Sequence, residues 1–226
     1  MKILALDCTG VVATAAIVTE DKVVCEFNIN NKLTHAENLM PMVLECFKFS
    51  ETDKSEIDFV AVTSGPGSFT GLRIGAATAK SIAHGLGVGL IPVPTLDSLA
   101  YNIFSPNCTI IPIMDARRGE CYCAIYEQCG YTQKRVSDYM AAGIDKILGL
   151  TDNYNNQIIF LGDAAPVYKD IIIGYNKNFL FAHHNNNMQR AASVGRLAIN
   201  NTGSAIPYSG FKPFYIRLPQ AEMNLS

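Results

Sequence analysis

The sequence predicts an α/β protein of two duplicated lobes, each with a mixed sheet flanked by helices, the second lobe being reduced. Three observations predict this fold: the order of strands and helices in the first half, a hairpin pattern that recurs in the second half, and a composition suited to a compact core. The chain has 226 residues, of which 49% are hydrophobic and 17% charged, so it can bury a sizeable interior. The predicted lobes are residues 1–106 and 107–226.

The first lobe begins with three strands that turn signals at "CTG" and "EDK" join into an antiparallel meander. Helices and strands then alternate, and a purely parallel sheet would not begin with a meander. The predicted strands are 1–7, 12–19, 22–30, 57–63 and 89–93, and the predicted helices are 34–49, 69–86 and 95–104. This order is that of one lobe of the actin-like ATPase fold.

A repeat supports a second lobe. When "ILALDCTGVVATAAI" is set over "IIPIMDARRGECYCAI" at an offset of 108 positions, a strand ending in Asp, a tight turn and a returning strand occur twice. The aligned pairs are Ile3 with Ile111, Leu6 with Met114, Asp7 with Asp115, Ala16 with Ala124 and Ile17 with Ile125. Beyond this hairpin we expect a helix over 138–150, a strand and turn over 157–165, and a loop leading into a helix over 181–201.

Charge and composition narrow the function classes. The net charge of −2 and the pI near 6.1 leave no basic footprint for unaided nucleic-acid binding. Asp7 interrupts the first apolar run too early for a signal peptide, and no run is long enough to span a membrane, so we expect a cytoplasmic protein. The seven cysteines include no C-x-x-C pair, which favours reduced thiols over a disulfide framework or a zinc site.

Two turns stand where an actin-like ATPase would hold phosphates and a metal-water shell. The first, with Asp7 and Thr9, keeps a glycine and could form a nest of backbone N–H groups. The second, from Asp115 to Arg118, places bulky residues where a close approach to phosphate favours glycine. Since no Walker motif occurs either, we interpret both turns as vestigial.

The stretch "VTSGPGSFTGLRIGAATAKSIAHGLG" at 62–87 raises three alternatives: a phosphate cradle, a catalytic turn or a packing device. It lacks the lysine of a P-loop and the G-x-S-x-G spacing of a nucleophile elbow. Ser68 or Thr70 is suited to cap the following helix. The helix itself has a face of small residues, which lets another backbone come close and favours packing.

The first helix carries more apolar surface than one sheet requires. Thr34 and Glu37 form a capping box, and Pro41 either kinks the helix or lies in its first turn. Beyond Pro41 the apolar side chains cover an arc of about 220°, whereas a helix lying on a sheet needs a stripe of about 100°. A partner helix or the chain's own second lobe or tail could cover the surplus.

These residues resemble the TsaB (YeaZ) family, bacterial proteins required for threonylcarbamoyladenosine modification of tRNA. The resemblance rests on "ILALDCT", "LTHAENLMPMV", "PVPTLDSLA", "DARRGECY", "KPFYIRLP" and above all the glycine loop. The residues of that loop are Gly65, Pro66, Gly67, Ser68, Phe69, Thr70, Gly71 and Arg73. The sequence departs from the family pattern at Cys8, where Thr is usual, and in a short, asparagine-rich second lobe.

The resemblance implies an actin-like fold and a non-catalytic subunit that dimerises with and activates a catalytic TsaD-type paralogue, together with a TsaE-type ATPase. The TsaD-type subunit transfers threonylcarbamoyl to the adenosine beside the anticodon, and tRNA is reached only through the complex. Catalytic paralogues hold a metal with two histidines, where this chain has Thr95 and Leu99. The resemblance therefore implies no resident metal or tightly held cofactor, although ATP or ADP could sit at the boundary with partner subunits.

In such proteins the first two helices form the heterodimer interface and can also support a homodimer. The interface residues implied here are His35, Leu39, Met42, Val43, Cys46, Leu72, Ile74, Gly75, Thr78 and Ile82. The tail residues Tyr215 and Arg217 match the family motif, and we expect Arg217 to make an internal ion pair.

Two other classes remain open at this point. An ATP-dependent phosphotransferase of the same fold would need a competent second phosphate turn, which "DARRG" does not provide. A glycoprotease-like peptidase would need an H-x-x-x-H motif or a Ser-His-Asp set, and the sequence offers neither convincingly.

Overall fold

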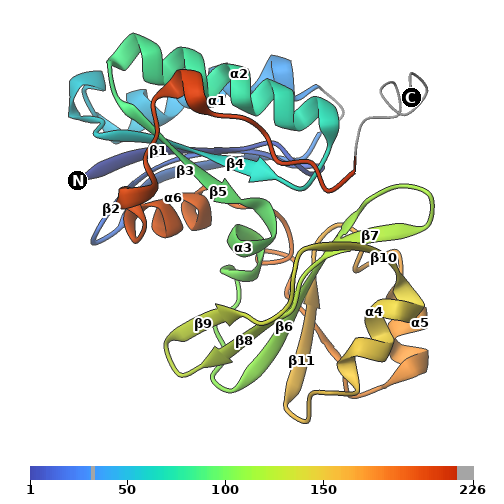
Figure 1. Ribbon diagram of the computed structural model, residues 1–226. Helices are drawn as coiled ribbons and strands as arrows, with labels where there is room; N and C mark the ends of the chain where they lie inside the picture. Colours follow the sequence, from blue (N-terminus) through green and yellow to red (C-terminus); the bar gives the residue numbers. More distant parts are fainter. Residues whose placement is uncertain (32–33, 218–226) are drawn as a thin grey trace. The chain divides into compact units, whose positions relative to one another are not determined.

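The computed structural model of the chain describes residues 1–31 and 34–217, and it divides them into two compact units (Figure 1). The first unit combines Met1–Ser98 with Gln189–Phe214, and the second contains Leu99–Met188 with the described residues 215–217. The predicted boundary at 106/107 assigned residues 189–214 to the second lobe, whereas the structure places them in the first. The motif residues Leu33, Leu218 and Pro219 lie outside the described residues.

The first unit is a five-stranded sheet of order β3-β2-β1-β4-β5. Strands β1 to β3 form the predicted meander, and β4 and β5 add to β1 in parallel. The strands are β1 (Lys2–Asp7), β2 (Ala13–Thr19), β3 (Val23–Ile29), β4 (Phe59–Gly65) and β5 (Gly89–Pro94). Its helices are α1 (His35–Ser50), α2 (Phe69–Leu86) and α6 (Ala191–Ile199), with 3₁₀ turns η1 (Lys54–Glu56), η2 (Thr202–Ser204) and η3 (Tyr208–Gly210). Helix α3 (Thr95–Ala100) begins in this unit and ends in the second.

Helices cover both faces of this sheet, α1 and α2 on one and α6 on the other (Figure 1). Because side chains alternate along a strand, Leu4 and Leu6 of β1 enter the core under α1 and α2, whereas Ile3 and Ala5 enter the core under α6. The capping box of Thr34 and Glu37 is present at the start of α1, and Pro41 lies inside the helix.

Helix α6 corrects the sequence analysis, which assigned it to the second lobe. Its small residues Ala191 and Ala198 pack on the first sheet with Val194 between them. Gly195 lies so close to Val18 that a Cβ on this glycine would collide with the valine side chain. The periodicity of the segment predicts a helix with a small face, but periodicity cannot say which sheet receives that face.

The second unit repeats the strand order of the first. Its main sheet has the order β10-β7-β6-β11-β12. Strands β6, β11 and β12 are parallel to one another, and β7 pairs in antiparallel fashion with both β6 and β10. Strand β6 therefore takes the position that β1 has in the first unit. An added hairpin, β8 with β9, pairs with the start of β6. The strands are β6 (Cys108–Asp115), β7 (Glu120–Cys123), β8 (Tyr126–Cys129), β9 (Thr132–Arg135), β10 (Met140–Gly143), β11 (Gln157–Leu161) and β12 (Leu180–Phe181).

Two helices, α4 (Ile144–Thr151) and α5 (Lys169–Tyr175), pack on this second sheet around Phe160. The helix predicted over 138–150 is therefore only half right, because its first part is the strand β10. The repeat is also shifted by one residue after the turn: Asp7 lies opposite Thr14, but Asp115 lies opposite Cys121. The second turn is one residue shorter, so the ungapped pairs Ala16/Ala124 and Ile17/Ile125 are not equivalent positions.

The packing of α6 can be tested at Gly195. Gly195→Ala should lower the free energy of unfolding by about 1–3 kcal/mol, because the added methyl collides with Val18 in a filled core. In the control Gly149→Ala the added Cβ in α4 meets nothing within 4 Å, so this change should be neutral or stabilise by up to about 1 kcal/mol. Urea unfolding measures both, and a Gly195→Ala protein as stable as the wild type would contradict the assigned contact.

Candidate functional site

The first predicted phosphate turn is closed by its own residues. Asp7 ends β1 and is fully buried, and its Oδ1 accepts hydrogen bonds from the Thr9 backbone N–H (2.8 Å), the Thr9 hydroxyl (2.6 Å) and the Thr63 hydroxyl (3.0 Å). Burial raises the pKa of the Asp7 carboxyl above its ordinary value, while the hydrogen bonds from Thr9 and Thr63 act in the opposite direction. The Thr9 amide is thus already engaged and does not face an open anion nest.

The glycine loop at 65–71 is pressed onto that turn. A Cβ on Gly71 would collide with the Cys8 carbonyl oxygen, and a Cβ on Gly67 would lie 2.6 Å from the Thr9 carbonyl oxygen. The Ser68 N–H donates to the Thr9 carbonyl (2.7 Å), and the Cys8 thiol donates to the Gly71 carbonyl (3.1 Å). The glycines therefore let two backbone segments touch, which is the packing alternative of the sequence analysis.

The loop also holds the C-terminal segment of the first unit and starts α2. Gly65 has a φ of +116°, and its peptide bond to Pro66 is cis. A Cβ on Gly65 would collide with the Phe214 carbonyl oxygen, and the Phe214 N–H donates to the Ser64 carbonyl (2.6 Å). Ser68 caps α2 by accepting from the Gly71 N–H (3.2 Å), as predicted, while Thr70 is exposed. Arg73 lies over the Phe69 ring at 3.9 Å.

The second predicted phosphate turn, between β6 and β7, contains Arg117 and Arg118. Arg117 and Arg118 both adopt positive φ (65° and 57°), a conformation that favours glycine. The Arg117 N–H donates to Asp115 Oδ1 (2.8 Å), and the Arg117 guanidinium pairs with the same carboxylate at 3.2 Å. Asp115 is thus held by its own turn. In the same unit Arg217 forms the expected internal ion pair, with Glu120.

The predicted interface residues divide into two groups. Six of them face the chain's own sheet and are buried, which corrects their assignment to a partner surface: Leu39, Met42, Val43, Cys46, Leu72 and Gly75. A Cβ on Gly75 would lie 3.2 Å from the Cys8 sulfur and 3.6 Å from Val62. Replacing Gly75 would therefore probe the core rather than pairing with a partner.

The other four are half-buried. His35 Nε2 lies 2.8 Å from the Gly10 carbonyl oxygen, so this side chain joins the start of α1 to the β1–β2 turn. Ile74, Thr78 and Ile82 recur every four residues along α2 and are partly exposed. The sequence analysis missed Met40 and Leu44 of α1, which are 42% and 53% exposed. We call Met40, Leu44, Ile74, Thr78 and Ile82 the α1–α2 outer face.

Within residues 1–31 and 34–217, no group of three or more His, Cys, Asp and Glu side chains could hold a metal, and both Thr95 and Leu99 are fully buried. Over the same ranges, no helix is both long and apolar enough to cross a bilayer. Burial raises the pKa of the Cys8 thiol to about 12, so this thiol is protonated at neutral pH.

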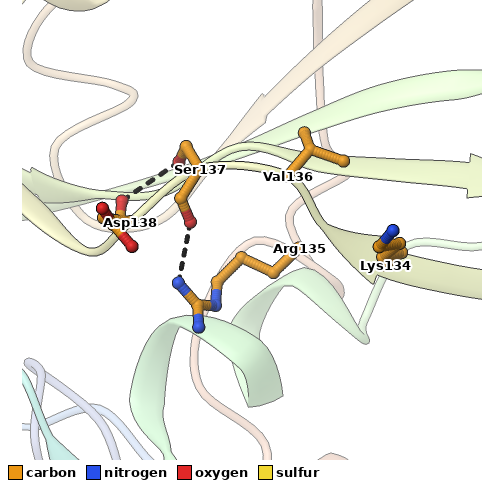
Figure 2. A pocket seen from close by; sticks show the side chains of 5 residues that line it. All are labelled: Lys134, Arg135, Val136, Ser137 and Asp138. Atoms are coloured by element: carbon orange, nitrogen blue, oxygen red, sulfur yellow. Dashed lines mark hydrogen bonds between the residues drawn. The ribbon is translucent and has the colours of Figure 1, made fainter.

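A shallow hollow of about 590 Å³ lies in the second unit along residues 134–138 (Figure 2). Its polar groups bind one another: the Arg135 guanidinium donates to the Ser137 carbonyl (2.7 Å), and the Ser137 hydroxyl donates to the Asp138 carbonyl (3.0 Å). None of the predicted site residues lines this hollow.

The contact between the glycine loop and the β1–β2 turn can be tested at Gly71. Gly71→Ala should destabilise the protein by about 2–3 kcal/mol, because the methyl meets a backbone carbonyl that cannot rotate away. Gly85→Ala in the same helix, where an added Cβ meets nothing within 4 Å, is the matched control. If chemical denaturation gave equal stabilities for the two variants, the packing role of the loop would be wrong.

Comparison with known proteins agrees with these features. The family model described as "TsaD: tRNA N6-adenosine threonylcarbamoyltransferase" matches residues 23–223. The tRNA threonylcarbamoyladenosine biosynthesis protein TsaB of Bacillus subtilis is 30% identical over 98% of this chain and 96% of its own length. TsaB of Escherichia coli is 33% identical over 57% of this chain and 56% of its own length.

Solved structures support the fold. YeaZ from Pseudomonas aeruginosa superposes with a TM-score of 0.77 at 20% identity, over 95% of this chain and 99% of its own. Component A of the (R)-2-hydroxyglutaryl-CoA dehydratase of Acidaminococcus fermentans gives 0.55 at 9% identity, over 90% and 99% of the two chains. The repeated strand order and these neighbours establish the actin-like ATPase fold. Taken with the match along nearly the whole length of the Bacillus protein, they show that the chain belongs to the TsaB (YeaZ) family of tRNA threonylcarbamoyladenosine biosynthesis proteins.

Proposed function

We propose that the chain is a non-catalytic subunit of the complex that makes threonylcarbamoyladenosine in tRNA. In this role it dimerises with a TsaD-type subunit and activates it for threonylcarbamoyl transfer to the adenosine beside the anticodon. The observation that carries the proposal is the α1–α2 outer face: Met40 and Leu44 of α1 are exposed, and Ile74 and Ile82 of the contacting helix α2 are partly exposed. An apolar surface of this kind, built on two adjacent helices, is typical of a protein–protein interface.

The hydrogen bonding and backbone conformation of the β1–β2 and β6–β7 turns support a non-catalytic role. The Thr9 amide is bonded to Asp7, and the second turn contains Arg117 and Arg118 at positive φ. An ATP-dependent phosphotransferase, the alternative function, needs free amides at both turns to hold phosphates. A peptidase is the weaker alternative, since a metallopeptidase would need a metal-binding group and none occurs among the described residues.

The wider assembly follows from the same proposal. A TsaE-type ATPase would join the pair, and ATP or ADP would bind at a boundary between subunits. The tRNA would be contacted through the catalytic subunit, consistent with a net charge of −2. In the absence of TsaD the same outer face could pair two copies of this chain, and we place the subunit in the cytoplasm.

The decisive experiment is size-exclusion chromatography with light scattering, on this protein alone and mixed with the TsaD-type subunit of the same organism, with and without ATP or ADP. A new one-to-one species is expected, and tRNA modification by the mixture should exceed that by the TsaD-type subunit alone. Independent elution under every nucleotide condition would sink the docking role and reopen the search for an autonomous ATP-dependent activity.

The outer face can be tested at Leu44. Leu44→Glu should weaken association with the TsaD-type subunit by tenfold or more, about 1.4 kcal/mol, because a carboxylate would be desolvated in an apolar contact. The free energy of unfolding should change by less than about 0.5 kcal/mol, since Leu44 is exposed in the isolated chain.

The matched control is Val167→Glu, an apolar residue of the second unit that is 74% exposed. This variant should bind the TsaD-type subunit as the wild type does. Equal loss of binding in both variants, or none in Leu44→Glu, would show that another surface makes the contact.

A further inference from the structure

Three fully buried side chains at the carboxyl end of the first sheet have polar atoms without a hydrogen-bond partner among the described residues. They are Asp7 through Oδ2, Thr95 through its hydroxyl, and Gln189 through both atoms of its amide. Buried polar atoms in folded proteins are almost always satisfied, and an exception calls for a bound group or another physical reason. These three residues contribute four buried side-chain atoms without a hydrogen-bond partner; the others found in the described chain are the Thr52 hydroxyl and Glu120 Oε2, and the latter is in the ion pair with Arg217.

The sheet register brings Asp7 and Gln189 to one place. Asp7 lies directly opposite Thr14, so both side chains point to the α6 face of the sheet. The Thr14 hydroxyl accepts from the Ala191 N–H (3.0 Å), which seats the start of α6 there. Two residues earlier, the Gln189 amide lies against Gly10, where an added Cβ would collide with it.

Thr95 reaches the same region from the other side of Asp7. The Thr63 hydroxyl donates to Asp7 Oδ1 (3.0 Å), and Thr63 lies beside Val93 of β5. Val93 packs in the core under α6, and Thr95, the first residue of α3, follows it by two positions, directly after the end of β5 at Pro94. The parallel strands β1, β4 and β5 end at one edge, so their last side chains on one face lie near each other.

The chemistry of these atoms fits a cation. Asp7 Oδ1 already accepts three hydrogen bonds, and Oδ2 is buried without a hydrogen-bond partner. His35 favours the charged form of Asp7 electrostatically, but the two side chains form no ion pair within the described ranges. A buried carboxylate without a counter-charge is costly. The other contributors are a hydroxyl and an amide oxygen, which are hard, neutral ligands suited to Na⁺, K⁺ or NH₄⁺. A divalent ion of the Ca²⁺ type takes six to eight oxygens and usually several carboxylates, whereas this cluster offers only one.

We propose that the first unit contains an internal binding site for a monovalent cation, held by Asp7 Oδ2, the Thr95 hydroxyl and the Gln189 amide oxygen. The site uses the side-chain oxygens of these three residues and not the backbone N–H groups of the β1–β2 turn, of which that of Thr9 is bonded to Asp7 Oδ1. A cation bound there would stabilise the β1–β2 turn through Asp7, whereas His35 and the glycine loop contact the backbone of the same turn at Gly10, Cys8 and Thr9. Cation binding would thereby brace the start of α1 and the loop before α2. This inference does not depend on the proposed function.

The test is thermal unfolding of the whole protein at constant ionic strength. Tetramethylammonium chloride, whose cation is too large for the site, is replaced stepwise by KCl, NaCl or NH₄Cl. A cation at a hundred times its dissociation constant should raise Tm by about 5 °C or more, and the three salts identify the preferred ion. Equal Tm values in all four salts would overturn the proposal and indicate that Asp7 is instead buried in its neutral form.

Asp7→Asn keeps the shape of the side chain and removes its charge, so the Tm of this variant should no longer depend on the cation. Asp115→Asn is the matched control, because Asp115 ends the equivalent strand β6 but is exposed and bonded to its own turn. Asp115→Asn should retain the wild-type response. A cation response that persists in Asp7→Asn would place the ion elsewhere and overturn the site.

If Asp7→Asn fails to fold, crystals of the wild-type protein soaked in thallium(I) acetate provide the second measurement. Thallium(I) substitutes for potassium and scatters anomalously. An anomalous peak between Asp7, Thr95 and Gln189 would support the site, and its absence at saturating thallium(I) would overturn it.

Discussion

The contact between the glycine loop and the β1–β2 turn is the constraint on which the rest of the first unit depends. Gly67 and Gly71 are required there because the carbonyl groups of Cys8 and Thr9 occupy the space of any side chain. That contact fixes where α2 begins, and the bond from His35 to Gly10 fixes where α1 begins relative to the same turn. The glycine loop and the β1–β2 turn thus form an internal contact that joins two helices to the sheet.

Much of this architecture could be predicted from the sequence. The meander, both long helices and the parallel strands of the first unit follow from alternating or helical periodicity and clear turn signals, and the structure has each of them. The packing role of the glycines was also predictable, because small residues at helical spacing next to a loop without lysine argue against phosphate binding. The partner backbone, Cys8 and Thr9, was not, since sequence spacing gives no distance between residues more than fifty positions apart.

The differences between the sequence-based predictions and the structure have physical causes. The apolar arc of α1 is so wide that both its sheet-facing and its exposed side chains satisfy a docking pattern, so Leu39 and Met42 were assigned outward while Leu44 was overlooked. Residues 138–150 contain the strand β10, whose run "MAAG" has no alternation to distinguish it from a helix. The one-residue shift of the repeated hairpin arises because a turn can shorten without changing the strand pattern around it.

The two lobes diverge most where their Asp-ending strands meet the following turns. In the first unit the turn is small and is enclosed by Gly10, Gly67 and Gly71, so Asp7 is sealed inside the fold. In the second unit the turn is one residue shorter and contains Arg117 and Arg118 at positive φ, and Asp115 remains exposed and paired with Arg117. The two turns therefore differ in what their backbone amides face: the Thr9 N–H donates to the buried Asp7, whereas the Arg117 N–H donates to the exposed Asp115. The sheets keep the same strand order in both units despite this difference.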